Sequence, residues 1–266
     1  MFCSGSWQPA KADAKIRIPS NAIFLCASSV KILLLADKTK EELKLQHSIA
    51  GDVYLHAGET AAMHFVLRAL KKVQLLHPNI RLHIVSGDRE SVLDALETGI
   101  ADFGMLYTPT DALRYEFLEI PFDETWGIIL PKSDPLATNN EIEMQELRDK
   151  PLILSRSMSP QVMRDGLDGL GWRDFKLVGT YNLLFNASLM VEDGLGYALA
   201  LDHILHFAPD SPLCFRPLAG GSHRMRPLEN FPFFRINLAW RRDRMMSRAA
   251  EALLDAIREE CTSLST

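Results

Sequence analysis

Short polar side chains and glycines follow the predicted strands of this sequence. In open α/β sheets a ligand binds beyond the carboxyl ends of the strands, where helix N-termini offer free N–H groups. Hydroxyls, an amide, one guanidinium and exposed backbone at such positions suit a small carboxylate or another polar metabolite. The candidate effector-binding residues are Gly58, Glu59, Thr60, Ser86, Gly87, Tyr107, Thr108, Ser155, Arg156, Ser157, Thr180, Tyr181 and Asn182.

Each candidate also has a purely structural interpretation. Thr60 and Asn182 could be ordinary helix caps, Arg156 could point to water, and Tyr107 could belong to the core. Glu59 would repel a carboxylate ligand if it faced inward, whereas at a solvent-facing helix start its charge suits the helix dipole. Among these residues we expect Thr60 to contact the effector and regard Glu59 as the weakest candidate.

Motifs for covalent catalysis or phosphate binding do not support an enzyme. Ser28 and Lys31 match S-x-x-K, but the S-D-N and K-T-G partners of that pattern do not occur. The sequence contains no G-x-S-x-G, no phosphate loop and no H-E-x-x-H. The glycines of "GLDGLG", residues 166–171, do not follow a strand, so we expect them to end a helix.

Metal and acid–base chemistry are equally weakly indicated. His203 and His206 are three residues apart, but no third ligand stands at a usable spacing for zinc. Glu116, Glu119 and the pair Asp123 and Glu124 form an acidic stretch that gives no sign of one raised and one lowered carboxyl pKa. We therefore predict no catalytic residues, no metal and no cofactor.

Composition indicates an ordinary globular protein that binds no membrane. The chain has 266 residues, a net charge of −5 and 47% hydrophobic residues, enough for two domains with their own cores. The charge argues against nucleic-acid binding through an overall positive field. The four cysteines form no C-x-x-C pair, which fits a reducing compartment, and the apolar stretch at 21–36 is too short to span a membrane. We expect a cytoplasmic protein.

The predicted elements alternate between strands and helices. This order predicts parallel sheets with right-handed crossovers, in two α/β halves of similar size. Residues 1–30 lack periodicity and 31–50 suggest a charged amphipathic helix. We expect strands at 51–58, 80–87, 100–108, 125–131, 151–155, 175–181, 197–201 and 231–242, and helices at 60–77, 88–99, 141–149, 159–171, 186–194 and 247–263.

Several ordered motifs resemble the effector-binding part of LysR-type transcriptional regulators. They are "ILLLADKTKEELKLQHSIAGDVYLHAGET", "LHIVSGDRESVLDALETGIADFGML", "ETWGIILPKSDPLA" and "VEDGLGYALAL", and the resemblance covers about residues 31–258. It implies a periplasmic-binding-protein-like fold of type 2, in which two Rossmann-like lobes are joined by two crossover strands and the effector binds between them. The implied divisions are an irregular segment 1–30, a linker helix 31–50, lobe I at 51–126 plus 232–261, and lobe II at 127–231.

The resemblance also implies partners. Members of this family carry an N-terminal winged helix-turn-helix, which residues 1–30 neither match nor have the length to form. We therefore expect this chain to reach DNA only indirectly, or through a winged helix-turn-helix that its sequence lacks. A homodimer or higher homo-oligomer is implied, with the helix after Thr60 near the closing helix of the partner. The alternative is a free-standing solute-binding protein of the same fold.

Overall fold

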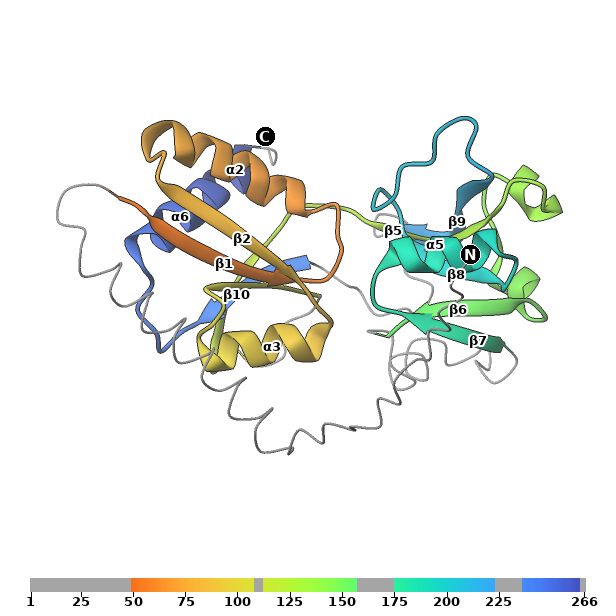
Figure 1. Ribbon diagram of the computed structural model, residues 1–266, viewed down its shortest axis with the longest axis horizontal. Coiled ribbons are helices and arrows are strands. Elements are labelled where there is room, and N and C mark those ends of the chain that lie inside the picture. Colours follow the sequence, from red (N-terminus) through yellow and green to blue (C-terminus); the bar gives the residue numbers. More distant parts are fainter. Residues whose placement is uncertain (1–48, 108–111, 157–174, 223–235, 264–266) are drawn as a thin grey trace, which may run out of the picture.

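Two mixed sheets, each with its own helices, form two lobes (Figure 1). The structure is a computed structural model that describes residues 49–107, 112–156, 175–222 and 236–263. The linker helix expected at 31–50, the irregular segment 1–30 and the helix expected at 159–171 fall wholly or almost wholly outside the described residues. Within the described ranges, no helix is long and apolar enough to cross a membrane.

Lobe I is built from elements between residues 51 and 119 and from elements between residues 236 and 263. Its sheet has the strand order β2-β1-β3-β10-β4. Helices α2 and α6 cover one face of this sheet, and α3 covers the other. The elements are β1 (Gly51–Ala57), α2 (Met63–Leu76), β2 (Ile80–Ser86), α3 (Arg89–Thr98), β3 (Phe103–Tyr107), β4 (Tyr115–Glu119), β10 (Ile236–Arg241) and α6 (Arg248–Ser263).

Local sequence explains where α3 begins and ends. The Asp88 carboxylate accepts a 3.0 Å hydrogen bond from the Ser91 backbone N–H and so caps the first turn. Gly99 ends the helix with φ 76°, a left-handed conformation that favours glycine. The predicted helix at 88–99 is therefore confirmed, and Ser86 and Gly87 are placed at the junction between β2 and α3.

Helices α2 and α6 are tied together by charge as well as by apolar packing. The buried Glu260 of α6 accepts hydrogen bonds from Arg68 Nε at 2.5 Å and from Lys72 Nζ at 2.6 Å, both on α2. Beneath them, Leu55, Ile80 and other apolar side chains are fully buried, each contributing roughly 1.5–3 kcal/mol relative to exposure. This packing fixes the start of α2 relative to the carboxyl end of β1.

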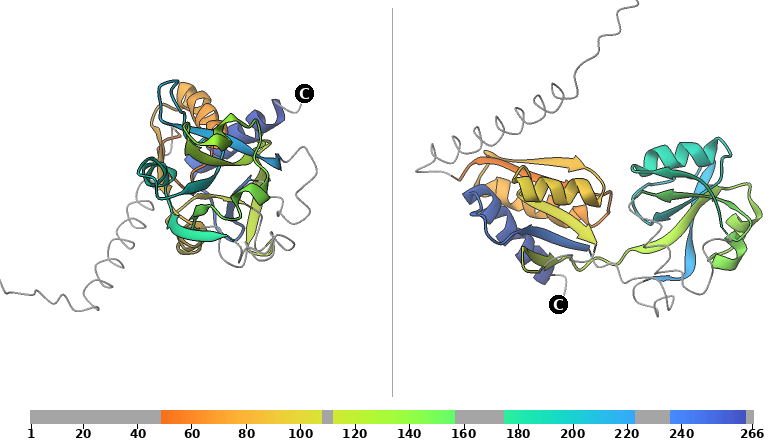
Figure 2. Two further views of the ribbon diagram at one scale, coloured as in Figure 1. Left: turned by 90° about the vertical axis from the view of Figure 1, so that its right-hand side faces the viewer. Right: turned by 90° about the horizontal axis from the view of Figure 1, so that it is seen from below.

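Lobe II is formed by the middle of the chain. Its sheet has the order β7-β6-β8-β5-β9, with α5 packed on one face and two short 3₁₀ helices on the other. Figure 2 shows the molecule from two further directions, and in its right-hand view the two lobes lie side by side. The elements are β5 (Thr125–Pro131), η1 (Pro135–Thr138), η2 (Met144–Leu147), β6 (Pro151–Ser155), β7 (Lys176–Tyr181), α5 (Leu184–Glu192), β8 (Tyr197–Leu201) and β9 (Leu213–Ser222).

Both sheets are mixed, so the parallel pairing expected from alternating strands and helices is confirmed only in part. Strands β1, β2 and β3 are parallel in lobe I, and β6, β7 and β8 are parallel in lobe II. Strand β10 runs antiparallel to β3 and β4, and β5 runs antiparallel to β8 and β9. The antiparallel strands are those at which the chain leaves one lobe for the other or returns to it. The parallel prediction therefore holds for β1, β2 and β3 and for β6, β7 and β8.

Three further elements differ from prediction. Strands β4 and β9 were not expected, and the helix predicted at 141–149 is only the 3₁₀ helix η2. Ile142 explains part of this difference, because it forms a bridge with Leu218 of β9 instead of continuing a helix. The lobe boundaries expected at residues 126 and 231 stay predictions.

Candidate functional site

The two lobes meet at a hydrogen bond between Glu59 and the start of α5. Glu59 follows β1 in lobe I, and its Oε2 accepts a 2.5 Å hydrogen bond from the backbone N–H of Leu184 in lobe II. The carboxyl end of β1 and the N-terminus of α5 therefore lie within hydrogen-bonding distance of each other. This is the arrangement in which one small ligand can touch both lobes.

Thr60, the next residue, turns into lobe I. It is only 9% exposed, and its hydroxyl donates a 2.6 Å hydrogen bond to Glu124 Oε1 while accepting one from the Ala62 N–H at 3.0 Å. The Tyr107 hydroxyl donates to the other oxygen, Glu124 Oε2, at 2.8 Å. One buried carboxylate thus joins the ends of β1 and β3 to the segment that leads into lobe II.

Burial decides the protonation of this cluster. It raises the pKa of Glu124 above its usual value, more than the hydrogen bonds from Thr60 and Tyr107 lower it. Burial, followed by the charge of Glu124, raises the pKa of Tyr107 well above its ordinary range. The sequence predicts no pair of raised and lowered carboxyl pKa values in the acidic stretch, and the structure raises the pKa of one member, Glu124, by burying it just before β5.

The glycines and serine of the candidate set lie at neighbouring strand ends. Gly87 N–H donates to the Ala57 carbonyl at 2.9 Å, which joins the ends of β2 and β1. Among the described residues, a Cβ added to Gly58 would meet only the Gly87 carbonyl oxygen, at 3.8 Å. Ser86 is exposed at the end of β2. The backbone at this edge is therefore accessible to a ligand.

Arg89 is a site candidate that sequence reasoning missed. It is the first residue of α3, it is half-buried, and its guanidinium donates a 3.2 Å hydrogen bond to the Tyr107 carbonyl. Burial lowers the pKa of this guanidinium. Among the described residues no carboxylate forms an ion pair with Arg89, so it is a cation available to an anionic ligand. Its place just after the β2–α3 junction is the signal that could have identified it.

The lobe II candidates divide into two groups. Tyr181 is buried and its hydroxyl donates to the Leu199 carbonyl at 2.8 Å, within the sheet of lobe II. Ser155 and Arg156 end β6 beside it, where the Arg156 N–H donates to the Tyr181 carbonyl at 2.7 Å. The Arg156 side chain is exposed, as are Thr180 and Asn182 at the end of β7. The fold therefore gathers these five residues at one edge of lobe II.

The charge of Arg156 reaches lobe I. Hydrogen bonds from Ser91 are the main reason that the pKa of Asp88 lies below its usual value, and the positive charge of Arg156 lowers it further. Asp88 caps α3 in lobe I, and Arg156 follows β6 in lobe II. Thr108 and Ser157 lie outside the described residues.

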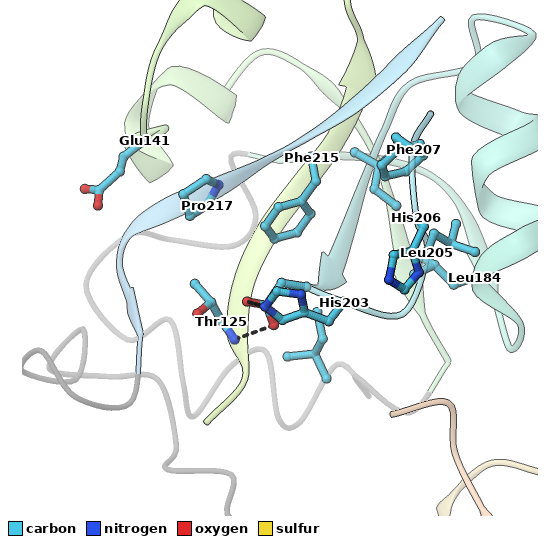
Figure 3. Close-up of a pocket in the computed structure, with 12 residues that line it drawn as sticks. Thr125, Glu141, Leu184, His203, Leu205, His206, Phe207, Phe215 and Pro217 are labelled. Carbon is cyan, nitrogen blue, oxygen red and sulfur yellow. Dashed lines mark hydrogen bonds and ion pairs between the residues drawn. The ribbon is translucent and has the colours of Figure 1, made fainter. Parts of the chain in front are cut away.

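A pocket of about 460 Å³ lies in lobe II, beside the start of α5 (Figure 3). None of the candidate effector residues lines it, although Leu184 contributes its side chain. At its base, the Thr125 N–H donates to Asp202 Oδ1 at 2.9 Å, and His203 adopts a φ of 60°, which is uncommon outside glycine. The pocket is lined by Thr125, Ile129, Glu141, Leu184, Leu201, Asp202, His203, Leu205, His206, Phe207, Phe215 and Pro217.

Metal binding gains no support from this geometry. His203 and His206 both line the pocket, and His203 Nε2 lies 3.2 Å from Asp202 Oδ2. In the part of the chain that the structure describes, no group of three or more His, Cys, Asp or Glu side chains could hold a metal ion. That the two histidines do not form a zinc site stays a prediction.

Comparison with known proteins gives the same architecture. The HTH-type regulator YvbU of Bacillus subtilis, itself uncharacterized, is 22% identical over 200 residues, covering 71% of this chain and 67% of YvbU. HinK, a LysR family regulator from Pseudomonas aeruginosa, superimposes with a TM-score of 0.63 at 18% identity, covering 94% of this chain and 83% of HinK. The effector binding domain of QuiR, solved with shikimate, gives a TM-score of 0.64 at 17% identity, covering 80% of this chain and 98% of that domain.

The family is settled by a match over most of the chain. The LysR substrate binding domain family matches residues 46–262, which include both lobes and both passages between them. The two-lobed, periplasmic-binding-protein-like fold expected from the sequence is confirmed by the structure and by its solved neighbours. This chain belongs to the LysR substrate binding domain family.

Proposed function

We propose that this chain is the effector-sensing domain of a LysR-type regulator and binds a small polar or carboxylate metabolite between its lobes. The observation that carries the proposal is the hydrogen bond from Leu184 to Glu59, because it brings the strand ends of lobe I against a helix N-terminus of lobe II. A ligand held there would bind both lobes and would favour one of their relative positions.

The chemistry of this edge suits an oxygen-rich ligand. Lobe I supplies the backbone of Gly58 and Gly87, the Ser86 hydroxyl and the Arg89 guanidinium, and lobe II supplies Arg156. Guanidinium groups bind carboxylates through paired hydrogen bonds. QuiR was solved in complex with shikimate, which is a carboxylate, and we extend that chemical class to this chain as part of the proposal.

The test is a thermal-unfolding screen of the whole chain with carboxylates and their neutral amides. A ligand that binds only the folded protein raises the midpoint of unfolding as its concentration rises. We expect a carboxylate to do so, and Arg156→Ala and Arg89→Met to weaken the response. Arg242→Ala is the matched control, because Arg242 is exposed at the opposite end of the lobe I sheet. If both site variants respond in full, the site assignment is wrong.

We also propose that the chain works in the cytoplasm as a homodimer or higher homo-oligomer. Helix α2 supports this assembly, because Leu67, Leu75 and Leu76 are 40%, 80% and 78% exposed on its surface. Apolar side chains exposed together on one helix are typical of protein–protein contacts. Analytical ultracentrifugation at micromolar concentration tests the proposal, and a protein that sediments as a monomer throughout would contradict it.

A further inference from the structure

Glu59 spans two lobes whose elements are far apart in the sequence. Its carboxylate and the Leu184 N–H are 125 residues apart and form a hydrogen bond of 2.5 Å. Glu59 comes from the loop before α2, and Leu184 is the first residue of α5. The bond therefore holds the start of one lobe's helix against the loop of the other lobe.

Helix α5 has no local group to satisfy its first N–H. Its N-cap residue is Leu183, an apolar residue that makes no side-chain capping hydrogen bond among the described residues. The first N–H groups of a helix have no acceptor within the helix and carry its positive dipole end. The Leu184 N–H consequently depends on Glu59, and the carboxylate from lobe I does what an Asp or Ser cap would do locally.

The charge of Glu59 is felt inside lobe II. Burial is the main cause that raises the pKa of Tyr181, and the negative charge of Glu59 adds to it. Tyr181 lies at the end of β7, close to α5 in sequence and packed in the same core cluster as Leu184. The Glu59 carboxylate thus occupies the first N–H of α5, at a helix end that favours negative charge.

We propose that Glu59 is a specificity-determining latch, an internal carboxylate that occupies the start of α5 and that an anionic effector must displace. The inference rests on the proposed function, because it concerns the same inter-lobe site. Displacement breaks the hydrogen bond between Glu59 and Leu184, and the Leu184 N–H then donates to the ligand instead. Ligand binding and the loss of this contact between the lobes are therefore one event. Arg89, the half-buried cation of lobe I, is available to the incoming ligand.

The latch has a direct consequence for affinity. A ligand carboxylate gains the Leu184 N–H only by breaking the bond to Glu59, so removing that competitor tightens binding. Hydrogen bonds to charged groups are strong enough for an effect of about tenfold on the dissociation constant. A neutral ligand offers this N–H no charged acceptor. Its dissociation constant is therefore expected to change by less than about twofold when Glu59 is replaced.

The experiment compares the whole chain with its Glu59→Gln and Glu59→Ala variants. Glu90→Gln is the matched control, because Glu90 is an exposed acid in the first turn of α3 in the same lobe. Benzoate and acetate serve as carboxylate probes, and benzyl alcohol is the neutral counterpart of benzoate. Hydrogen exchange of the Leu184 amide is measured without ligand, and dissociation constants follow from ligand-dependent unfolding midpoints.

We expect faster exchange at Leu184 in both Glu59 variants and about tenfold tighter benzoate binding, with Glu90→Gln unchanged in both. Unchanged exchange would show that no latch exists. Faster exchange with equal or weaker benzoate binding would show that Glu59 does not compete with the ligand. Glu59 would then be part of the binding surface. If neither the unaltered protein nor any variant responds to a carboxylate, both the proposed carboxylate ligand and its competition with Glu59 are wrong. The exchange rate of the Leu184 amide still shows separately whether Glu59 protects that amide.

Discussion

The Thr60 hydroxyl and the Glu124 carboxylate are 64 residues apart in sequence and 2.6 Å apart in space. Thr60 precedes α2 in lobe I, and Glu124 is the last residue before β5 carries the chain into lobe II. This bond connects the candidate site to the passage between the lobes. It is also why Thr60, expected to contact the effector, has its hydroxyl occupied by two partners within the protein.

Replacing Thr60 tests that connection. Thr60→Val keeps the shape but removes the hydroxyl, so the Ala62 N–H and Glu124 each lose a partner. We expect a loss of about 1–3 kcal/mol in the free energy of unfolding, measured by urea denaturation. Thr60→Ser is the control and should recover most of this loss. Equal stability of the valine variant and the unaltered protein would contradict the proposed role of the hydroxyl.

Glu124 predicts a distinctive pH dependence. Because its folded pKa is raised, the stability it contributes is fully present below its unfolded pKa, near 4.5, and is lost as pH rises through the folded pKa. Glu124→Gln retains an oxygen acceptor but cannot ionise. The unfolding midpoint of the variant minus that of the unaltered protein should therefore increase as pH rises from about 4.5 toward 8.

Other titrating groups are common to the two proteins, so their difference isolates Glu124. The measurement is thermal unfolding of both proteins at half-unit pH steps. A difference that stays constant across this window would mean that the folded pKa of Glu124 is not raised.

Arg89 predicts an effect on ligand binding with little effect on stability. Arg89→Met keeps the apolar stem and removes the cation, and we expect about tenfold weaker binding of a responsive carboxylate. Arg89→Lys keeps the charge but loses the paired donors, so its affinity for the ligand should lie between those of the unaltered protein and Arg89→Met. Isothermal titration of each variant is the measurement. Equal affinity in Arg89→Met would exclude Arg89 from the site.

Gly104 tests how tightly α3 packs on the sheet. A Cβ at this position in β3 would lie 2.6 Å from Val92 Cγ1 and 2.9 Å from Leu96 Cδ1. We expect Gly104→Ala to cost about 1–3 kcal/mol of unfolding free energy, because the buried helix must shift. Gly58→Ala, whose Cβ has ordinary contact distances in the described structure, should cost no more than about 0.5 kcal/mol. Similar losses in both variants would show that the α3 contact is not limiting.

Sequence periodicity and local caps were sufficient for most of the elements. The alternation in β1, the helix between Asp88 and Gly99, and the apolar face of α6 depend on neighbours within a few residues. Such signals are contained in short segments, so they can be predicted without knowing the fold. Local signals also place the candidate residues at strand ends. A strand end can be predicted from its neighbouring residues, although the site itself combines distant segments.

Long-range pairing decided what the sequence left open. Strands β4 and β9 pair with strands from distant segments of the chain. Such pairing also sets the antiparallel direction of β5 and β10 within their sheets. Glu59 is the weakest candidate from sequence because an inward-facing carboxylate would repel a carboxylate ligand. Only the packing of two lobes brings it to Leu184, and only the fold buries Glu124 beneath Thr60 and Tyr107. The sequence alone determined which groups stand at the strand ends, and the tertiary structure decided their partners, because hydrogen bonding and desolvation depend on segments that meet only after folding.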